Sequence, residues 1–175
     1  MKSPRWKVEP AWRGETAAIL GGGPRLTPAQ VEHCRGRCRV IAVNNAYQLA
    51  PWADIVYWCD EVWYEWHLAH KAFRGFSGMK VALENARPWV HDPLIRCINN
   101  YGELGLCEIP DGVNTGRSSG FQACNLAFHL GVKRILLLGF DMRAVNGRTH
   151  WHAEHKRGTA PQDYASHMLP PFKLL

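Results

Sequence analysis

Short apolar runs, each followed by polar or glycine-rich residues, recur along the chain. Six of them are predicted to be strands, because strands buried on both faces show continuous apolar runs rather than alternation. A mostly parallel sheet buries its strands in this way. The six runs lie at residues 17–20, 39–43, 54–59, 79–83, 95–99 and 134–139.

Helical patterns separate several of these runs. Residues 27–30 open one helix with a capping box and a proline in its first turn. We expect a short helical turn at 46–49, a helix with an aromatic face from 61 to about 73, and a helix over 118–130 that ends at Gly131. Strands that alternate with helices predict an α/β fold, with a Rossmann-like open, mostly parallel sheet covered by helices on both faces.

The chain has 175 residues, enough for one domain with a full core and too few for two ordinary ones. Residues 1–14, rich in Pro, Trp and charge, are expected to form an irregular arm, and residues 15–175 a single α/β domain. Residues 169–175 resemble the start of a helix that the chain does not complete. This pattern suggests a domain truncated at its C-terminus relative to a longer ancestor.

Composition and charge narrow the classes of function. No apolar run is long enough to span a bilayer, and the N-terminus lacks the apolar stretch of a signal peptide, so we predict a cytoplasmic protein. The six cysteines lack the paired spacing of a zinc ribbon and are interpreted as reduced thiols. A net charge of +6 favours an anionic partner, but the basic residues are scattered, which argues against nucleic acid.

Two loops rich in small residues connect to predicted helices. One is Gly21–Gly23, directly after the first strand, and the other is Ser118–Gly120, before the long helix. Ligands of open α/β sheets bind outside the carboxyl ends of the strands, and the amino end of a helix attracts anions. The two loops therefore suggest a nucleotide or another phosphorylated ligand. For Gly21–Gly23 the alternative is a tight turn only, since the sequence matches neither the dinucleotide fingerprint nor a P-loop.

Polar side chains also follow the second, third and last predicted strands. Asn44 and Asn45 can hydrogen-bond a base or ribose, or else cap the short helix. Asp60 and Asp141 can hold a ribose hydroxyl or a metal, or else serve as a helix cap and a loop anchor. We expect the nucleotide to contact Gly21, Gly22, Gly23, Asn44, Asn45, Asp60, Ser118, Ser119, Gly120 and Asp141.

A histidine-rich stretch follows the last strand. His150, His152 and His155 lie within six residues, close in sequence to Arg143 and Arg148. Imidazole can act as a general base, bind a metal or hold a phosphate, and the alternative is a polar loop with incidental histidines. We expect the catalytic base among these three histidines and a phosphate contact from the two arginines, and no stable metal site.

Four of these motifs together resemble a known group of proteins. Ile19-Leu-Gly-Gly-Gly-Pro-Arg-Leu26, Val43-Asn-Asn45, Ser118-Ser-Gly120 and Leu138-Gly-Phe-Asp141 resemble bacterial sialyltransferases of glycosyltransferase family 42. They look equally like archaeal hydroxymethylpterin pyrophosphokinase-like proteins, and most like uncharacterised prophage proteins of that broad group. The resemblance covers most of residues 16–155.

The resemblance implies roles for particular residues and also has departures. It implies that Gly21–Gly23 and one of the two asparagines contact the nucleotide, and that Ser119 meets a phosphate or the acid group of a donor sugar. The sialyltransferase loop has asparagine where Gly22 stands, and its two phosphate-binding tyrosines fall near Arg143 and His150 here.

Three hypotheses follow for the function. The first is a nucleotide-dependent transferase, glycosyltransferase-like, with a nucleotide-sugar donor and a histidine base. The second is a pyrophosphokinase-like enzyme that uses ATP with magnesium as its cofactor, held by Asp60 and Asp141. The third is a phage-derived nucleotide-binding domain without catalysis, which the replaced tyrosines and the short C-terminus favour.

Overall fold

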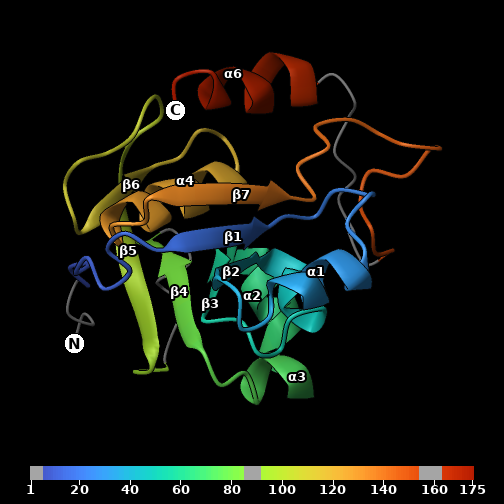
Figure 1. Cartoon of the computed structure of the whole chain (residues 1–175), viewed down its shortest axis with the longest axis horizontal. Coiled ribbons are helices and arrows are strands. Elements are labelled where there is room, and N and C mark those ends of the chain that lie inside the picture. The colour runs from blue at the N-terminus through green and yellow to red at the C-terminus, as the bar shows by residue number, and fades with distance from the viewer. Residues whose placement is uncertain (1–5, 85–91, 154–162) are drawn as a thin grey trace.

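One parallel sheet organises the molecule (Figure 1). The computed structural model describes residues 6–84, 92–153 and 163–175. Within them seven strands pair in the order β6-β5-β4-β3-β2-β1-β7, and every neighbouring pair is parallel. The predicted Rossmann-like open α/β sheet is confirmed. The strands are β1 (Thr16–Leu20), β2 (Arg39–Val43), β3 (Ile55–Trp58), β4 (Met79–Leu83), β5 (Ile95–Gly102), β6 (Gly112–Asn114) and β7 (Arg134–Leu138).

Helices cover both faces of the sheet. One face is covered by α1 (Pro28–Cys34), the 3-10 helix η1 (Asn44–Gln48), α2 (Glu61–Leu68) and α3 (Lys71–Arg74). The other face is covered by α4 (Ser119–His129) together with Val8 and Trp12 of the N-terminal arm. In the described parts of the chain, no helix combines the length and the apolar character that crossing a membrane requires.

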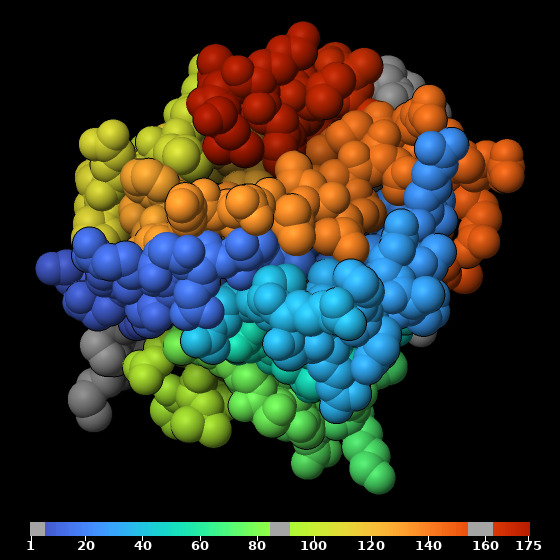
Figure 2. Space-filling view, in the orientation of Figure 1, coloured from blue at the N-terminus to red at the C-terminus, as the bar shows by residue number. Residues whose placement is uncertain are grey.

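The C-terminal segment packs against the end of the sheet that carries β7. A π-helical turn, η3 (Tyr164–Met168), leads into α6 (Leu169–Phe172). The ring of Phe172 in α6 contacts Phe121 of α4 and Phe140 after β7, with ring centroids 5.4 and 5.8 Å apart. Figure 2 shows this segment, in red, packed against the orange residues around β7.

Two elements differ from the sequence prediction. The helix expected from residue 61 to about 73 is interrupted, because His70 between α2 and α3 is extended (φ −67°, ψ 121°). At about 100° per residue, a continuous helix would point Phe73 well away from the face that carries His67. The interruption lets both rings pack on Tyr47. The second difference is β6, which was not predicted because its three residues, Gly112–Asn114, form no apolar run.

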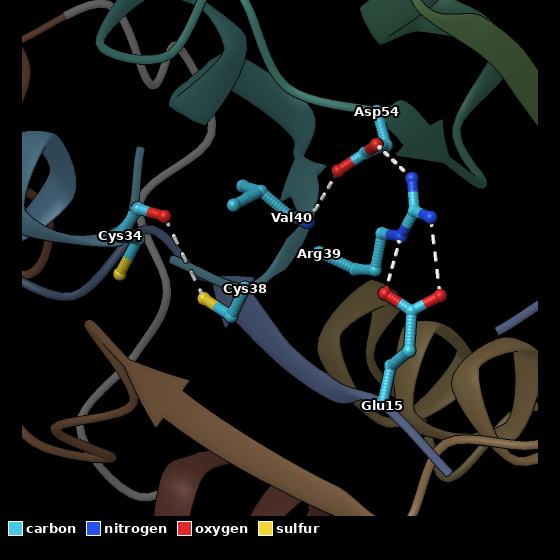
Figure 3. A network of polar contacts seen from close by, with 6 residues as sticks. All are labelled: Glu15, Cys34, Cys38, Arg39, Val40 and Asp54. Carbon is cyan, nitrogen blue, oxygen red and sulfur yellow. Dashed lines mark hydrogen bonds and ion pairs between the residues drawn. The ribbon is translucent and has the colours of Figure 1, made fainter. Parts of the chain in front are cut away.

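At the amino ends of the strands, a polar network joins β1, β2 and β3 (Figure 3). Arg39 donates from Nε to Glu15 at 2.8 Å and from Nη1 to Asp54 at 3.2 Å, and Asp54 accepts from the Val40 amide at 2.7 Å. The Arg39 guanidinium lowers the pKa of the Glu15 carboxyl. This network lies at the opposite end of the strands from the predicted ligand-binding edge, and its role is to hold the strand ends together.

Candidate functional site

A cavity of about 720 Å³ lies at the carboxyl ends of β1, β2, β3 and β7. Its volume is in the range of small-molecule and cofactor sites. The walls come from the loops after these four strands, one face of α2, the amino end of α4, and the segment 163–168. The cavity is therefore where open α/β sheets bind their ligands.

Nearly all of the residues singled out in the sequence line this cavity. The two exceptions are Arg148, which is exposed and donates from Nη2 to the Trp151 carbonyl at 2.7 Å, and His155, which lies outside the described residues. Arg148 thus closes a turn rather than facing the cavity. The predicted residues in the wall are Gly21, Gly22, Gly23, Asn44, Asn45, Asp60, Ser118, Ser119, Gly120, Asp141, Arg143, His150 and His152.

The glycine loop packs tightly against the loop after β7. The amides of Gly21 and Gly23 donate to the carbonyls of Leu138 and Gly139, at 2.8 and 2.7 Å. A Cβ on Gly23 would collide with the Asp141 carboxylate, so the absence of a side chain is required there. Gly22 accepts from the Trp151 amide at 3.1 Å, and a Cβ on Gly22 would lie 2.9 Å from the His150 ring. Gly22 therefore holds the histidine loop against the end of β1, and Gly21 and Gly23 hold the loop after β7 there.

The amino end of α1 offers fewer free donors to an anion than its position after the glycine loop suggested. The Thr27 amide donates to Gln30 Oε1 at 2.9 Å, and the Gln30 amide donates to Thr27 Oγ1 at 3.3 Å. Pro28 has no amide hydrogen. The predicted capping box is confirmed, and it uses two of the donors that an anion would need.

Asn44 and Asn45 play different parts at the end of β2. The Asn45 side chain is buried and accepts from Trp63 Nε1 at 2.7 Å, which ties the loop to α2. Asn44 has left-handed backbone (φ 50°), and its Oδ1 is buried with no hydrogen-bond partner among the described residues. Neither side chain caps η1, whose first turn follows Val43. A buried carbonyl oxygen without a donor is costly, and it marks a place where a ligand can donate a hydrogen bond.

The amino end of α4 offers donors to the cavity. Ser118 caps the helix, with Oγ accepting from the Phe121 amide at 3.2 Å. The amides of Ser119 and Gly120 have no partners inside the helix, as in any first helical turn. Gly120 lies beneath the Phe140 ring, which leaves no room for a Cβ. These two amides and the positive end of the helix dipole favour an anionic group at this wall.

The two acidic residues at the cavity also differ. Asp60 precedes α2, but its side chain makes no capping bond, and the carboxylate is exposed. The Asp141 carboxylate instead accepts from the Arg25 amide at 3.1 Å and lies 3.9 Å from Arg25 Nε. It therefore acts as the loop anchor that was the alternative to ligand binding. Within the described ranges, no group of three or more His, Cys, Asp or Glu side chains could hold a metal ion.

Cys59, next to Asp60, also lines the cavity. Its sulfur lies 3.0 Å from Ser119 Oγ. Burial raises the pKa of the Cys59 thiol to about 12, so the thiol remains protonated at neutral pH. Its contact with Ser119 joins the end of β3 to the start of α4.

His150 and His152 lie in a loop that is held on two sides. Tyr164 of η3 donates from its hydroxyl to the Thr149 carbonyl at 3.4 Å, and the Trp151 amide is bonded to the glycine loop. The two imidazoles line the cavity with ring centroids 5.4 Å apart. Held in this way, either ring can exchange a proton with a ligand in the cavity.

Sequence reasoning missed two groups of lining residues. Trp63, Trp66 and His67 follow the i, i+3, i+4 spacing of one helical face, and this aromatic face was noticed in the sequence without being assigned to the site. Asp163, Tyr164 and Met168 come from the C-terminal segment, and no local motif marks them. The other lining residues are Pro24, Val43, Cys59, Glu61, Val62, Arg117, Gln122, Gly139, Phe140, Met142 and Thr149.

Comparison with protein-family models, with curated proteins and with solved structures gives no match for this chain. The resemblance to family 42 sialyltransferases and to pyrophosphokinase-like proteins rests on the sequence motifs alone.

Proposed function

We propose that this chain is a nucleotide-dependent transferase of the glycosyltransferase-like kind, with a nucleotide-sugar donor. The observation that supports it most is the convergence of the glycine loop, Asn44, the amino end of α4 and the two histidines on one cavity. These segments are far apart in the sequence, and each supplies a group that suits a different part of such a donor.

The charges and donors of the cavity support one orientation of the donor. Phosphate groups would lie against the amides of Ser119 and Gly120, within reach of the exposed Arg143. The unpaired Oδ1 of Asn44 would accept from a ribose hydroxyl or from the base. The Asp60 carboxylate would accept from a hydroxyl group next to the phosphates, since Asp60 Oδ2 and Ser119 Oγ both lie close to Cys59 Sγ. The nucleoside would therefore lie toward β2 and β3.

The transfer step follows from this orientation. The acceptor hydroxyl oxygen attacks the anomeric carbon of the donor sugar, while the bond from that carbon to the phosphate oxygen breaks. The hydroxyl proton passes to His150 or His152, and the electron pair of the broken bond leaves with the nucleotide phosphate. The α4 amides and Arg143 then stabilise the negative charge that develops on the phosphate.

The pyrophosphokinase-like alternative keeps one supporting observation. The Asp60 carboxylate is open to the cavity and could bind magnesium carried by ATP. The pairing of Asp141 with Arg25 weakens this alternative, because it occupies the second carboxylate that was expected to bind the metal.

Thermal unfolding with a panel of nucleotides tests the proposal. The protein would be heated with CMP, CDP, UDP, GDP or ATP, each with and without magnesium. A ligand at ~100 times its dissociation constant stabilises the fold by about 2.7 kcal/mol, which is readily measured. We expect a cytidine, uridine or guanosine nucleotide to raise the melting temperature without metal.

The other outcomes distinguish the alternatives. A shift seen only with ATP and magnesium would replace the proposal with the pyrophosphokinase-like function. Nucleotide binding without transfer to any acceptor would indicate a binding domain without catalysis. No shift with any nucleotide would contradict the proposal.

A further inference from the structure

We propose that the nucleobase stacks on Trp66, so that α2 forms the base-binding wall of the cavity. This inference rests on the proposed function, since it needs a nucleotide in the cavity. It goes further because it assigns the base to a helix that no motif in the sequence connects with nucleotide binding.

The spacing in α2 places an aromatic side chain in the cavity wall. Trp63, Trp66 and His67 lie on one helical face, and all three line the cavity. Trp63 and His67 are buried, at 7% and 4% exposure, whereas Trp66 is half-buried. Trp66 is therefore the most exposed of the three rings.

The rings beside Trp66 are fixed in place. Trp63 stacks on His67, with centroids 4.2 Å apart and planes 17° apart. Trp63 Nε1 donates to Asn45, and the Tyr47 hydroxyl lies 2.7 Å from His67 Nδ1. Phe73 packs edge-on against Trp63. A wall held this rigidly loses little conformational entropy when a planar ligand binds to it.

The length of α2 separates Trp66 from the phosphate site. The start of α2 lies beside the amino end of α4, because Cys59 Sγ lies 3.7 Å from Asp60 Oδ2 and 3.0 Å from Ser119 Oγ. Trp66 is six residues beyond Asp60, about 9 Å further along the helix. With the phosphates held at the α4 amides, a base that extends along α2 meets its aromatic face, and bases stack on such rings whatever their identity.

The test compares ligands with and without a base. Affinities for CDP, UDP, GDP and ADP, and for ribose 5-phosphate, would be measured by calorimetry on the wild type and on Trp66→Ala, Trp66→Leu and Trp66→Phe. Leucine keeps apolar volume without a ring, and phenylalanine keeps a ring. The control is Trp52→Ala, because Trp52 is half-buried on the same side of the sheet, against Arg35, and does not line the cavity.

We expect Trp66→Ala and Trp66→Leu to weaken binding of the tightest nucleotide about 5- to 150-fold. Trp66→Phe should stay within about threefold of the wild type, and Trp52→Ala should not change affinity. Ribose 5-phosphate should bind all variants equally, which a merely structural role of Trp66 would not produce.

Two results would overturn the inference and are distinct from each other. Nucleotide binding to the wild type with unchanged affinity in Trp66→Leu would reject stacking on Trp66 and leave the proposed function intact. A wild type that binds none of the nucleotides would reject both.

Discussion

Left-handed backbone at residues other than glycine gathers around the cavity. Asn44, Arg117 and Met142 have φ of 50°, 55° and 48°, and all three line it. This conformation costs an ordinary side chain about 1 kcal/mol or more, and such strain persists where the surrounding structure fixes it, commonly at functional sites. At Asn44 the buried side-chain oxygen also lacks a hydrogen-bond partner among the described residues.

Asn44→Gly is expected to weaken nucleotide binding about threefold to tenfold, the value of one hydrogen bond. Glycine adopts the same backbone without strain, so the change removes only the amide. The matched control is Asn146→Gly, because Asn146 also has φ of 50° but is exposed and does not line the cavity. Calorimetry on both variants provides the measurement, and equal losses in the two would contradict a role for Asn44.

The histidines should affect turnover more than binding. His150→Gln or His152→Gln is expected to lower the turnover number about 10²- to 10⁴-fold if that ring is the general base. The dissociation constant of the nucleotide should change little, because the base acts on the acceptor hydroxyl. Steady-state rates and calorimetry separate the two effects, and small equal losses in both variants would remove the proposed proton transfer.

At the scale of elements, α4 connects the site to the far edge of the sheet. It packs across β6, β1, β2 and β3. At its amino end it faces the cavity, and at its carboxyl end His129 Nε2 lies 2.8 Å from the Gly112 carbonyl at the start of β6. The same helix therefore presents amides to the ligand and anchors the shortest strand.

His129 gives the stability a pH dependence. Burial lowers the pKa of His129 below its ordinary value of 6.5, with the Gly112 carbonyl and Asp111 opposing that shift. The folded state thus favours the neutral ring. When the pH falls through 6.5, the unfolded chain takes up a proton that the folded chain resists, so stability is lost toward acid pH.

His129→Gln should flatten this dependence, because the amide still donates to Gly112 but does not titrate. Urea unfolding at pH 7.5 and 5.5 would measure the loss of stability in the wild type and the variant. His33→Gln, at an exposed position of α1, is the control and should behave as the wild type. An unchanged pH dependence in His129→Gln would show that other groups cause it.

Elements with a strong local signal could be predicted, and those set by distant contacts could not. The capping box at Thr27 predicted the start of α1, and the apolar runs predicted β2 and β4 to the residue. The interruption at His70 follows from rings that pack on Tyr47, and β6 exists because Gly112–Asn114 pairs with β5. Neither contact is visible in the local pattern.

At the scale of the whole molecule, the strand order assembles the site. The chain passes strand by strand from β1 to β6, and α4 then returns it to β7, on the other side of β1 (Figure 1). This return brings the loop after β7, with His150, beside Gly22. The sequence indicated that the polar residues follow strands, and parallel pairing then placed them at one edge.

The wall formed by the C-terminal segment was missed because its position depends on contacts between residues far apart in the sequence. Such contacts leave no local pattern. Tyr164 lines the cavity in a C-terminal segment that packs against Phe121 and Phe140 through Phe172. The bond from Arg148 to the Trp151 carbonyl could not be predicted either, since it depends on the path of the loop.

The most direct test of the central claim is a crystal structure with the nucleotide that stabilises the protein most. We expect electron density in the cavity, with phosphate at the amides of Ser119 and Gly120, a hydrogen bond to Asn44 and the base against Trp66. A nucleotide bound at any other surface, with this cavity empty, would contradict the proposed function.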